Sequence, residues 1–140
     1  MIISILAAIA LPSFLNQANR AKQVAAITHV SATNRAQQVY RLENSRFATT
    51  NAQLGTGLPE STTDYVYTIT ADGGSSAVVV ATPNDVDALR GFSGGVAVTP
   101  EGGTTTEICR TTGVQSQAPV QPPTVTSTTV TCSGNMENSR

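Results

Sequence analysis

Apolar residues dominate the start of the chain and then continue at regular intervals. Residues 2–11 read IISILAAIAL, in which only Ser4 is polar. Polar side chains become frequent after Pro12, yet no glycine interrupts residues 2–54, and the next proline is Pro59. This uninterrupted stretch predicts a single helix from Ile2 to about Asn44, about 65 Å long.

One side of the predicted helix is apolar along its whole length. Positions spaced alternately by four and three residues form this side, which we call the seam, and seven of its nine members are apolar. Ile27 and Val30 lie nearly opposite the seam, so the helix is expected to have packing partners on two faces. The seam consists of Phe14, Ala18, Ala21, Ala25, Thr28, Ala32, Arg35, Val39 and Leu42.

The N-terminal apolar run is too short to cross a membrane by itself. Ten helical residues cover about 15 Å, half of a hydrocarbon core about 30 Å thick. Three interpretations stay open: a secretory signal peptide cleaved at Ala8-Ile9-Ala10, a buried core helix, or a membrane segment that begins upstream of Met1. No Lys or Arg precedes the run, and the helix pattern continues past Ala10, which disfavours the signal peptide.

The helix is also longer than the rest of the chain can cover. We therefore expect lipid, other copies of the chain, or each in turn to bury its first half. The alanines of the seam favour close approach between helices. Pro12 removes one hydrogen bond within the helix, so this turn is a natural kink or melting point.

The second half of the sequence has the alternation of β-strands. Residues 51–64 predict an exposed connector, and strands are expected at 65–71, 77–82, 92–99 and 106–111, with a turn at 72–74. Such a sheet needs a cover on one face, and the C-terminal half of the helix is the available element. We predict an α+β fold with a helical part, residues 1–50, and a β-rich head, residues 51–140. Ile27, Val30 or the later seam residues would contact the sheet.

The two cysteines, Cys109 and Cys132, favour a disulfide over two separate buried thiols. No second cluster of Cys or His lies nearby, so the spacing of a four-ligand zinc site is absent. Closing a loop of this size would stabilise the fold by about 3 kcal/mol in an oxidising compartment. The Pro- and Thr-rich residues 114–131 inside the loop have too little apolar content to fold without that closure.

Composition and charge point away from enzymes and cytosolic proteins. Charged residues make up 12% of the chain, and the hydroxyl-rich second half suggests an extracellular surface. Residues 1–46 hold five basic residues and one acidic residue, a net +4, whereas the remainder holds three basic and eight acidic residues, a net −5. A basic stem therefore carries an acidic head.

Candidate chemistry in the sequence is sparse. His29 is the only histidine, which leaves catalytic triads and paired-His metal sites incomplete, so we interpret it as a helix-surface or interface residue. Asn84, Asp85 and Asp87 lack the closing Glu of a calcium loop and are interpreted as a solvated turn. We expect no catalytic residue, no metal site and no cofactor.

Two segments resemble a known family. ILAAIALPSFLNQANRAK at 5–22 resembles the lower half of the type IV pilin N-terminal helix. NRAQQVYRLENSRFAT at 34–49 is similar to cyanobacterial pilins often grouped with type IV pilin-like G/H proteins. GFSGGVAVT at 91–99 and the C-terminal cysteine pair fit the same group.

The resemblance implies a structural subunit, not an enzyme, that polymerises through its N-terminal helix. It implies an extracellular fibre (a fimbrium) for motility, adhesion or DNA uptake, with subunits stored in the bacterial inner membrane before assembly. Expected partners are other copies, minor pilins and the inner-membrane assembly platform, with DNA or surfaces as targets of the whole fibre. The disulfide-bounded region would face outward. Residues 1–13 would form the membrane and fibre-core segment, and the helix would unwind at Pro12. Residues 14–50 would form the amphipathic part, whose seam packs against other helices. The membrane and fibre-core contacts would come from Ile2, Ile3, Ile5, Leu6, Ile9 and Leu11.

The start of the chain departs from the family pattern. The basic leader, the Gly of the processing site, the methylated Phe and the following Glu would all lie upstream of Met1. Adding about ten residues would bring the apolar run to the roughly 20 that span a membrane, so we expect the native helix to begin earlier. Two alternatives remain: a type II secretion pseudopilin, and a membrane-anchored binding domain that does not polymerise.

Overall fold

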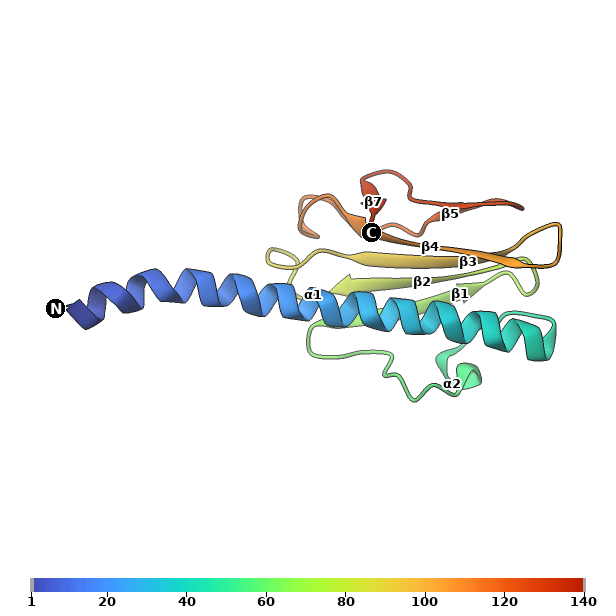
Figure 1. Cartoon of the computed structure of the whole chain (residues 1–140), viewed down its shortest axis with the longest axis horizontal. Coiled ribbons are helices and arrows are strands. Elements are labelled where there is room, and N and C mark those ends of the chain that lie inside the picture. Colours follow the sequence, from blue (N-terminus) through green and yellow to red (C-terminus); the bar gives the residue numbers. More distant parts are fainter. Residues whose placement is uncertain (1, 140) are drawn as a thin grey trace.

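A single long helix lies across one face of a sheet and projects well beyond it (Figure 1). This computed structural model describes residues 2–139, and it describes side-chain surroundings for residue 5 and residues 11–139. Helix α1 (Ile2–Asn44) is continuous through Pro12. The predicted single helix is therefore confirmed, including its end at Asn44.

The sheet is antiparallel, and its strands follow one another in space in the order β1-β2-β3-β4-β7. All four predicted strands are confirmed, with ends shifted by one or two residues. The short elements were not predicted, because two to four residues are too few to show a period. The strands are β1 (Tyr65–Ala71), β2 (Ser76–Pro83), β3 (Phe92–Val98), β4 (Thr104–Thr111) and β7 (Met136–Asn138), and the short additions are α2 (Asn51–Leu54) and the pair β5 (Thr124–Val125) and β6 (Val130–Thr131).

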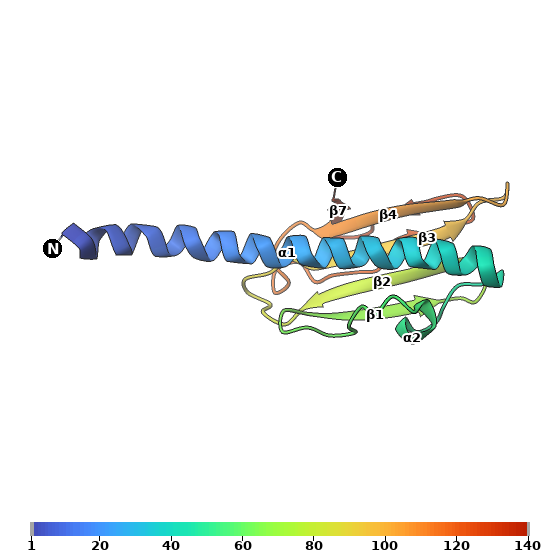
Figure 2. The same ribbon diagram turned by 60° about the horizontal axis from the view of Figure 1, so that its bottom comes forward.

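The C-terminal half of α1 supplies the cover for the sheet, as both ribbon views show (Figures 1 and 2). Ala26 and Val30 are fully buried against a core that includes Tyr65, Val79 and Phe92. The Tyr65 hydroxyl donates to the Arg90 carbonyl at 2.7 Å. Burial, the neighbouring Tyr67 and Asp64 together raise the pKa of Tyr65 well above its ordinary value. The expectation of an α+β fold with Val30 against the sheet is confirmed.

Of the alternatives for the contact with the sheet, the structure uses Ile27 and Val30, and the last residues of the seam stay largely exposed. The exposed fractions of Val39 and Leu42 are 53% and 80%. Thr33, Asn34 and Gln37 are buried in their place. The sheet accepts these polar side chains because each has hydrogen-bond partners, for example Asn34 with Thr106 on β4 at 2.9 Å.

Two adjacent glycines of β3 set how closely the layers pack. A Cβ atom on Gly94 would lie 2.6 Å from Val30 Cγ1 and 2.8 Å from Asn34 Nδ2 of α1. On Gly95 it would lie 2.8 Å from Val130 Cγ1 and 2.9 Å from the Pro123 ring. Because successive strand residues point to opposite faces, α1 packs on one side of β3 and the β5–β6 segment on the other.

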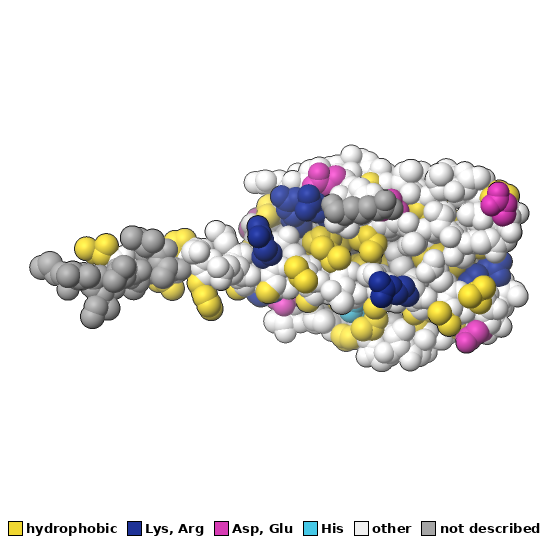
Figure 3. Space-filling model, viewed as in Figure 1, with side chains coloured by type: hydrophobic (Ala, Val, Ile, Leu, Met, Phe, Trp, Pro, Cys, Tyr) yellow, Lys and Arg dark blue, Asp and Glu magenta, His cyan; other side chains and the backbone are white. Residues whose placement is uncertain are grey.

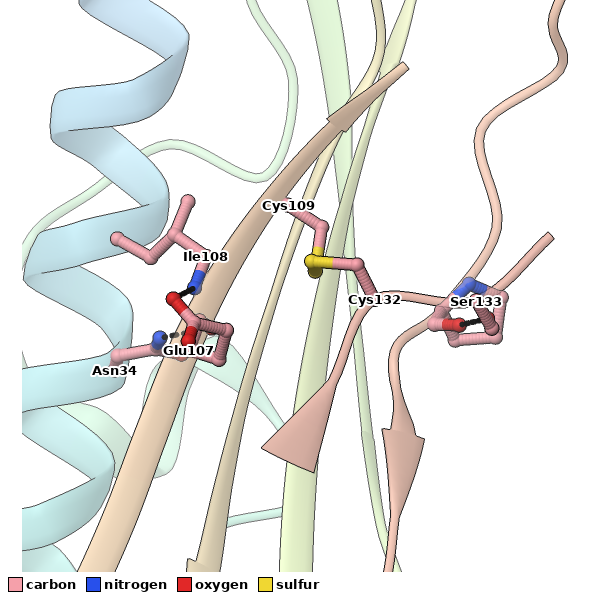
Figure 4. The surroundings of a disulfide bond; sticks show 7 residues. Asn34, Glu107, Ile108, Cys109, Cys132 and Ser133 are labelled. Atoms are coloured by element: carbon pink, nitrogen blue, oxygen red, sulfur yellow. Dashed lines mark hydrogen bonds between the residues drawn. A yellow bond between two sulfur atoms is a disulfide. The ribbon is translucent and has the colours of Figure 1, made fainter. Parts of the chain in front are cut away.

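The predicted disulfide is present and holds that second layer in place. The Cα atoms of Cys109 and Cys132 are 5.6 Å apart, and Cys109 is fully buried. Figure 4 shows the bond joining β4 to the segment that follows β6, on the far side of β4 from α1. The Pro- and Thr-rich segment is thereby tied to the sheet at its end.

The connector between α1 and β1 is fastened to the helix by specific contacts. Gln37 is buried and bonds Ala48 twice, donating to its carbonyl and accepting from its N–H, each at 2.9 Å. Lys22 and Asp64 form an ion pair at 3.1 Å near the other end of the connector. Residues 51–64, predicted as an exposed connector, are exposed or half-buried and include the short helix α2, whereas the buried Phe47 and Ala48 precede this stretch.

His29 was interpreted as a helix-surface or interface residue, and its burial rules out the helix-surface alternative. Its ring stacks on Tyr67 with centroids 3.5 Å apart, and Nε2 lies 2.9 Å from the Pro59 carbonyl. Because a carbonyl only accepts, Nε2 carries the hydrogen. His29 therefore joins α1, β1 and the connector.

Filling the space at Gly94 should weaken the packing of the helix on the sheet. We expect Gly94→Ala to lower the free energy of unfolding by about 1–3 kcal/mol, because the β-branched Val30 has little freedom to move away. Urea denaturation measures the change. Gly74→Ala is the matched control, since a Cβ there meets nothing within 4 Å. Equal stability of the two variants would contradict the close contact.

Removing the Gln37 amide should loosen the start of the connector. Gln37→Leu leaves the Ala48 N–H and carbonyl without partners, and each buried orphan costs about 1–3 kcal/mol. Hydrogen exchange at the Ala48 amide should therefore accelerate strongly in Gln37→Leu. The control is Gln38→Leu, which removes the hydrogen bond from Gln38 to Thr104 and should leave the Ala48 amide protected. Unchanged exchange at Ala48 in Gln37→Leu would count against the contact.

Candidate assembly interface

The seam forms one exposed face of α1, directed away from the sheet. The exposed fraction is 69% for Phe14 and 80% for Leu42, and Ala21 and Ala25 between them are also exposed. Ala18 and Ala32 are half-buried. Figure 3 shows apolar side chains on this side of the head and along the described part of the projecting helix. The structure thus brings the predicted seam residues together on one face.

Geometry explains why the head cannot cover the seam. The buried residues of α1 centre on Ala26, Val30 and Gln37, which at about 100° per residue lie on the other side of the helix from the seam. The seam runs from Phe14 to Leu42, about 42 Å along the axis. An apolar face of this length differs from the scattered apolar side chains of ordinary surfaces, which makes it the candidate interaction site of the chain.

Further apolar side chains widen the exposed face. Leu11 continues the seam towards the N-terminus, and Val24 flanks it, whereas Leu15 lies on the side that carries Ala26 further along the helix; all three are exposed. Sequence reasoning missed Leu15 and Val24 because it followed a single line of positions. Their signal is the apolar type on an otherwise polar helix surface.

The structure describes side-chain surroundings for only two of the predicted membrane contacts. Ile5 and Leu11 are exposed, whereas the side chains of Ile2, Ile3, Leu6 and Ile9 lie outside the described residues. Pro12 lies inside α1 and is exposed, and its missing N–H leaves one helical hydrogen bond unmade. Within the described residues, no helix has enough continuous apolar length to cross a membrane.

The candidate acidic turn is a structural cap. The Asp85 carboxylate accepts from the N–H groups of Asp87 and Ala88, and Asn84 donates to the carbonyls of Thr62 and Thr63. The described part of the chain contains no group of three or more His, Cys, Asp or Glu side chains able to hold a metal ion. These residues fasten loops to one another.

Shallow hollows lie along α1 on the side of the connector and α2. The hollow beside His29 measures about 450 Å³ and is lined by Asn51, Tyr67 and hydroxyl side chains of the connector and β1. Another, of about 460 Å³, lies between the end of α1 and α2 and is lined by Val39, Tyr40 and Glu43. The second hollow adjoins the seam, so it extends the exposed face sideways.

Comparison with known proteins agrees with this geometry. Residues 23–133 match a family model described as type IV pilin-like G and H. The matched region contains the covered half of α1, the four long strands and the disulfide Cys109–Cys132. No curated protein matches the chain.

The family and the disulfide together indicate where the head resides. Pilin-like proteins form a structural family, and disulfides persist in oxidising compartments outside the cytoplasm. A helix laid on an antiparallel sheet, with a disulfide-bounded C-terminal segment, is the pilin-like fold. The match covers well over half of the sequence, and the chain therefore belongs to the type IV pilin-like G/H family.

Proposed function

We propose that the protein is a structural subunit of a type IV pilus and that it polymerises through α1. The observation that supports this most is the exposed apolar seam from Phe14 to Leu42, on the face of the helix that the sheet leaves uncovered. Alanines at the centre of the seam allow helix axes to approach closely. Packed against the helices of other copies, the seam would be shielded from water, while the heads would remain outside.

The N-terminal part of α1 would have one role before assembly and another after it. Before assembly its apolar side chains, including Ile5 and Leu11, would lie in the inner membrane; after assembly they would lie in the core of the fibre. Pro12 marks the turn with the missing hydrogen bond, where α1 would unwind during this transfer. The minor pilins and the assembly platform of the inner membrane would be the partners in that step.

The head would form the outer surface of the fibre. Its disulfide-bounded segment lies on the sheet face away from α1, so it would face outward when the seam is buried. Motility, adhesion or DNA uptake would then be activities of the whole fibre. A binding domain that never polymerised would leave the seam in water, which disfavours that alternative.

Charges introduced into the seam should stop assembly without unfolding the subunit. Ala21 and Ala25 are exposed, so Ala21→Glu and Ala25→Glu should leave the head intact. Burying an unpaired carboxylate between helices costs several kcal/mol, so we expect sheared fibre to fall more than about tenfold while total subunit is unchanged. Electron microscopy and immunoblotting of sheared and cell-associated fractions measure the effect.

A matched control is available on the short helix. Ala52→Glu makes the same change at an exposed position of α2, away from the seam, and should assemble normally. Wild-type fibre yield from Ala25→Glu, or absence of this protein from the fibres of unmodified cells, would contradict the proposed function.

A further inference from the structure

Arg35 is the one charged residue of the seam. Burial of the seam between copies would therefore desolvate the Arg35 guanidinium. Its side chain is exposed. Ion pairs in the described part of the chain join Lys22 to Asp64 and join Arg90 and Arg110 to Glu137, so none of them involves Arg35. Arg35 borders a hollow of about 290 Å³ whose lining includes Thr106 and Glu107 of β4, but it forms no ion pair with them. Packing of the seam would remove water from its guanidinium, and an acceptor on another copy would compensate for that loss.

Glu43 is the acidic residue of α1, and it is placed to be that acceptor. It is exposed and takes part in none of the ion pairs of the described residues. It lines the hollow of about 460 Å³, whose walls combine Val39, Tyr40 and Leu54 with the amide side chains of Asn44 and Gln53. The apolar part of the lining suits the aliphatic stem of an arginine, and the Glu43 carboxylate suits its guanidinium.

The spacing of the seam connects these two residues between copies. Seam positions repeat every seven residues, as in 14, 21, 28, 35 and 42. If two parallel helices packed without a shift, Arg35 would face Arg35, a contact between like charges. A shift by one repeat, about 10.5 Å, still aligns seam positions with seam positions. It places Arg35 of one copy beside Leu42 of the next, between Val39 and Glu43 of that copy.

We infer that Arg35 of each subunit enters the Glu43 hollow of the next one and that this ion pair sets the axial shift between them. The inference rests on the proposed function, since it concerns how copies contact one another through the seam. The contact joins different surfaces of the two copies and includes a translation. Such contacts do not close on themselves and generate an open filament.

Charge exchange tests the pair directly. Arg35→Glu and Glu43→Arg should each reduce sheared fibre more than about tenfold, because each places like charges together. The double variant Arg35→Glu/Glu43→Arg should restore most of the yield. Arg46→Glu is the control: Arg46 is exposed and follows α1, outside the seam, so fibre yield should stay within about twofold of the wild type. All variants should accumulate to wild-type levels in cells.

Failure of the inference can be told apart from failure of the proposed function. If the wild type forms fibres containing this subunit, and either single variant assembles normally or the double variant is not restored, the Arg35–Glu43 pair is wrong and the proposed function stands. If unmodified cells make no fibre from this subunit, the proposed function itself fails.

Cysteine cross-linking tests the shift independently. The native cysteines are already joined in the described structure, so introduced thiols report only new contacts. Mild oxidation of fibres from Arg35→Cys/Glu43→Cys should give a ladder of covalent oligomers, and Arg35→Cys alone should stay monomeric. Dimers from Arg35→Cys alone would show unshifted helices and overturn the inference.

Discussion

The close approach of α1 to β3 at Gly94 is the contact on which the head depends. Because Gly94 has no side chain, Val30 and Asn34 can pack directly on the backbone of β3. This contact brings Val30 into the apolar core with Tyr65 and Phe92. Gly95 repeats the arrangement on the opposite face, where Pro123 and Val130 pack. A single strand thus receives the helix on one side and the disulfide-bounded segment on the other.

The same contact determines which face of α1 remains exposed. Because polar residues such as Gln37 and Asn34 are satisfied inside the head, the apolar seam is left on the outside. Ordinary amphipathic helices place only polar residues outward, whereas α1 is apolar both at Ala26 and Val30 inside the head and along the exposed seam. In the proposed function, other copies of the chain cover the seam. The head fold and the proposed polymer are therefore two results of one distribution of residues around the helix.

The sequence was sufficient for the elements with a long, clear period, and insufficient for contacts that depend on three-dimensional partners. The helix to Asn44 and the four long strands follow from periodicity, and the disulfide follows from cysteine number and spacing. The orientation of α1 was only partly predicted, because the burial of Asn34 and Gln37 depends on hydrogen bonds to β4 and to the connector. The contacts of His29 were not predicted for a related reason: its stacking on Tyr67 joins residues separated by a long connector. Among the short elements, α2 is bounded by local caps at Thr50 and Gly55, and β7 takes its structure from pairing with β4.

The arrangement of α1 in an assembled fibre tests the central claim most directly. A cryo-electron microscopy structure of fibres sheared from cells that produce this protein would show it. We predict helices α1 of many copies packed together along the fibre axis, with Ala25 and Ala32 at the contacts between them and the Cys109–Cys132 segment on the outer surface. A fibre in which the seam faces solvent, or in which the heads form the core, would contradict assembly through α1.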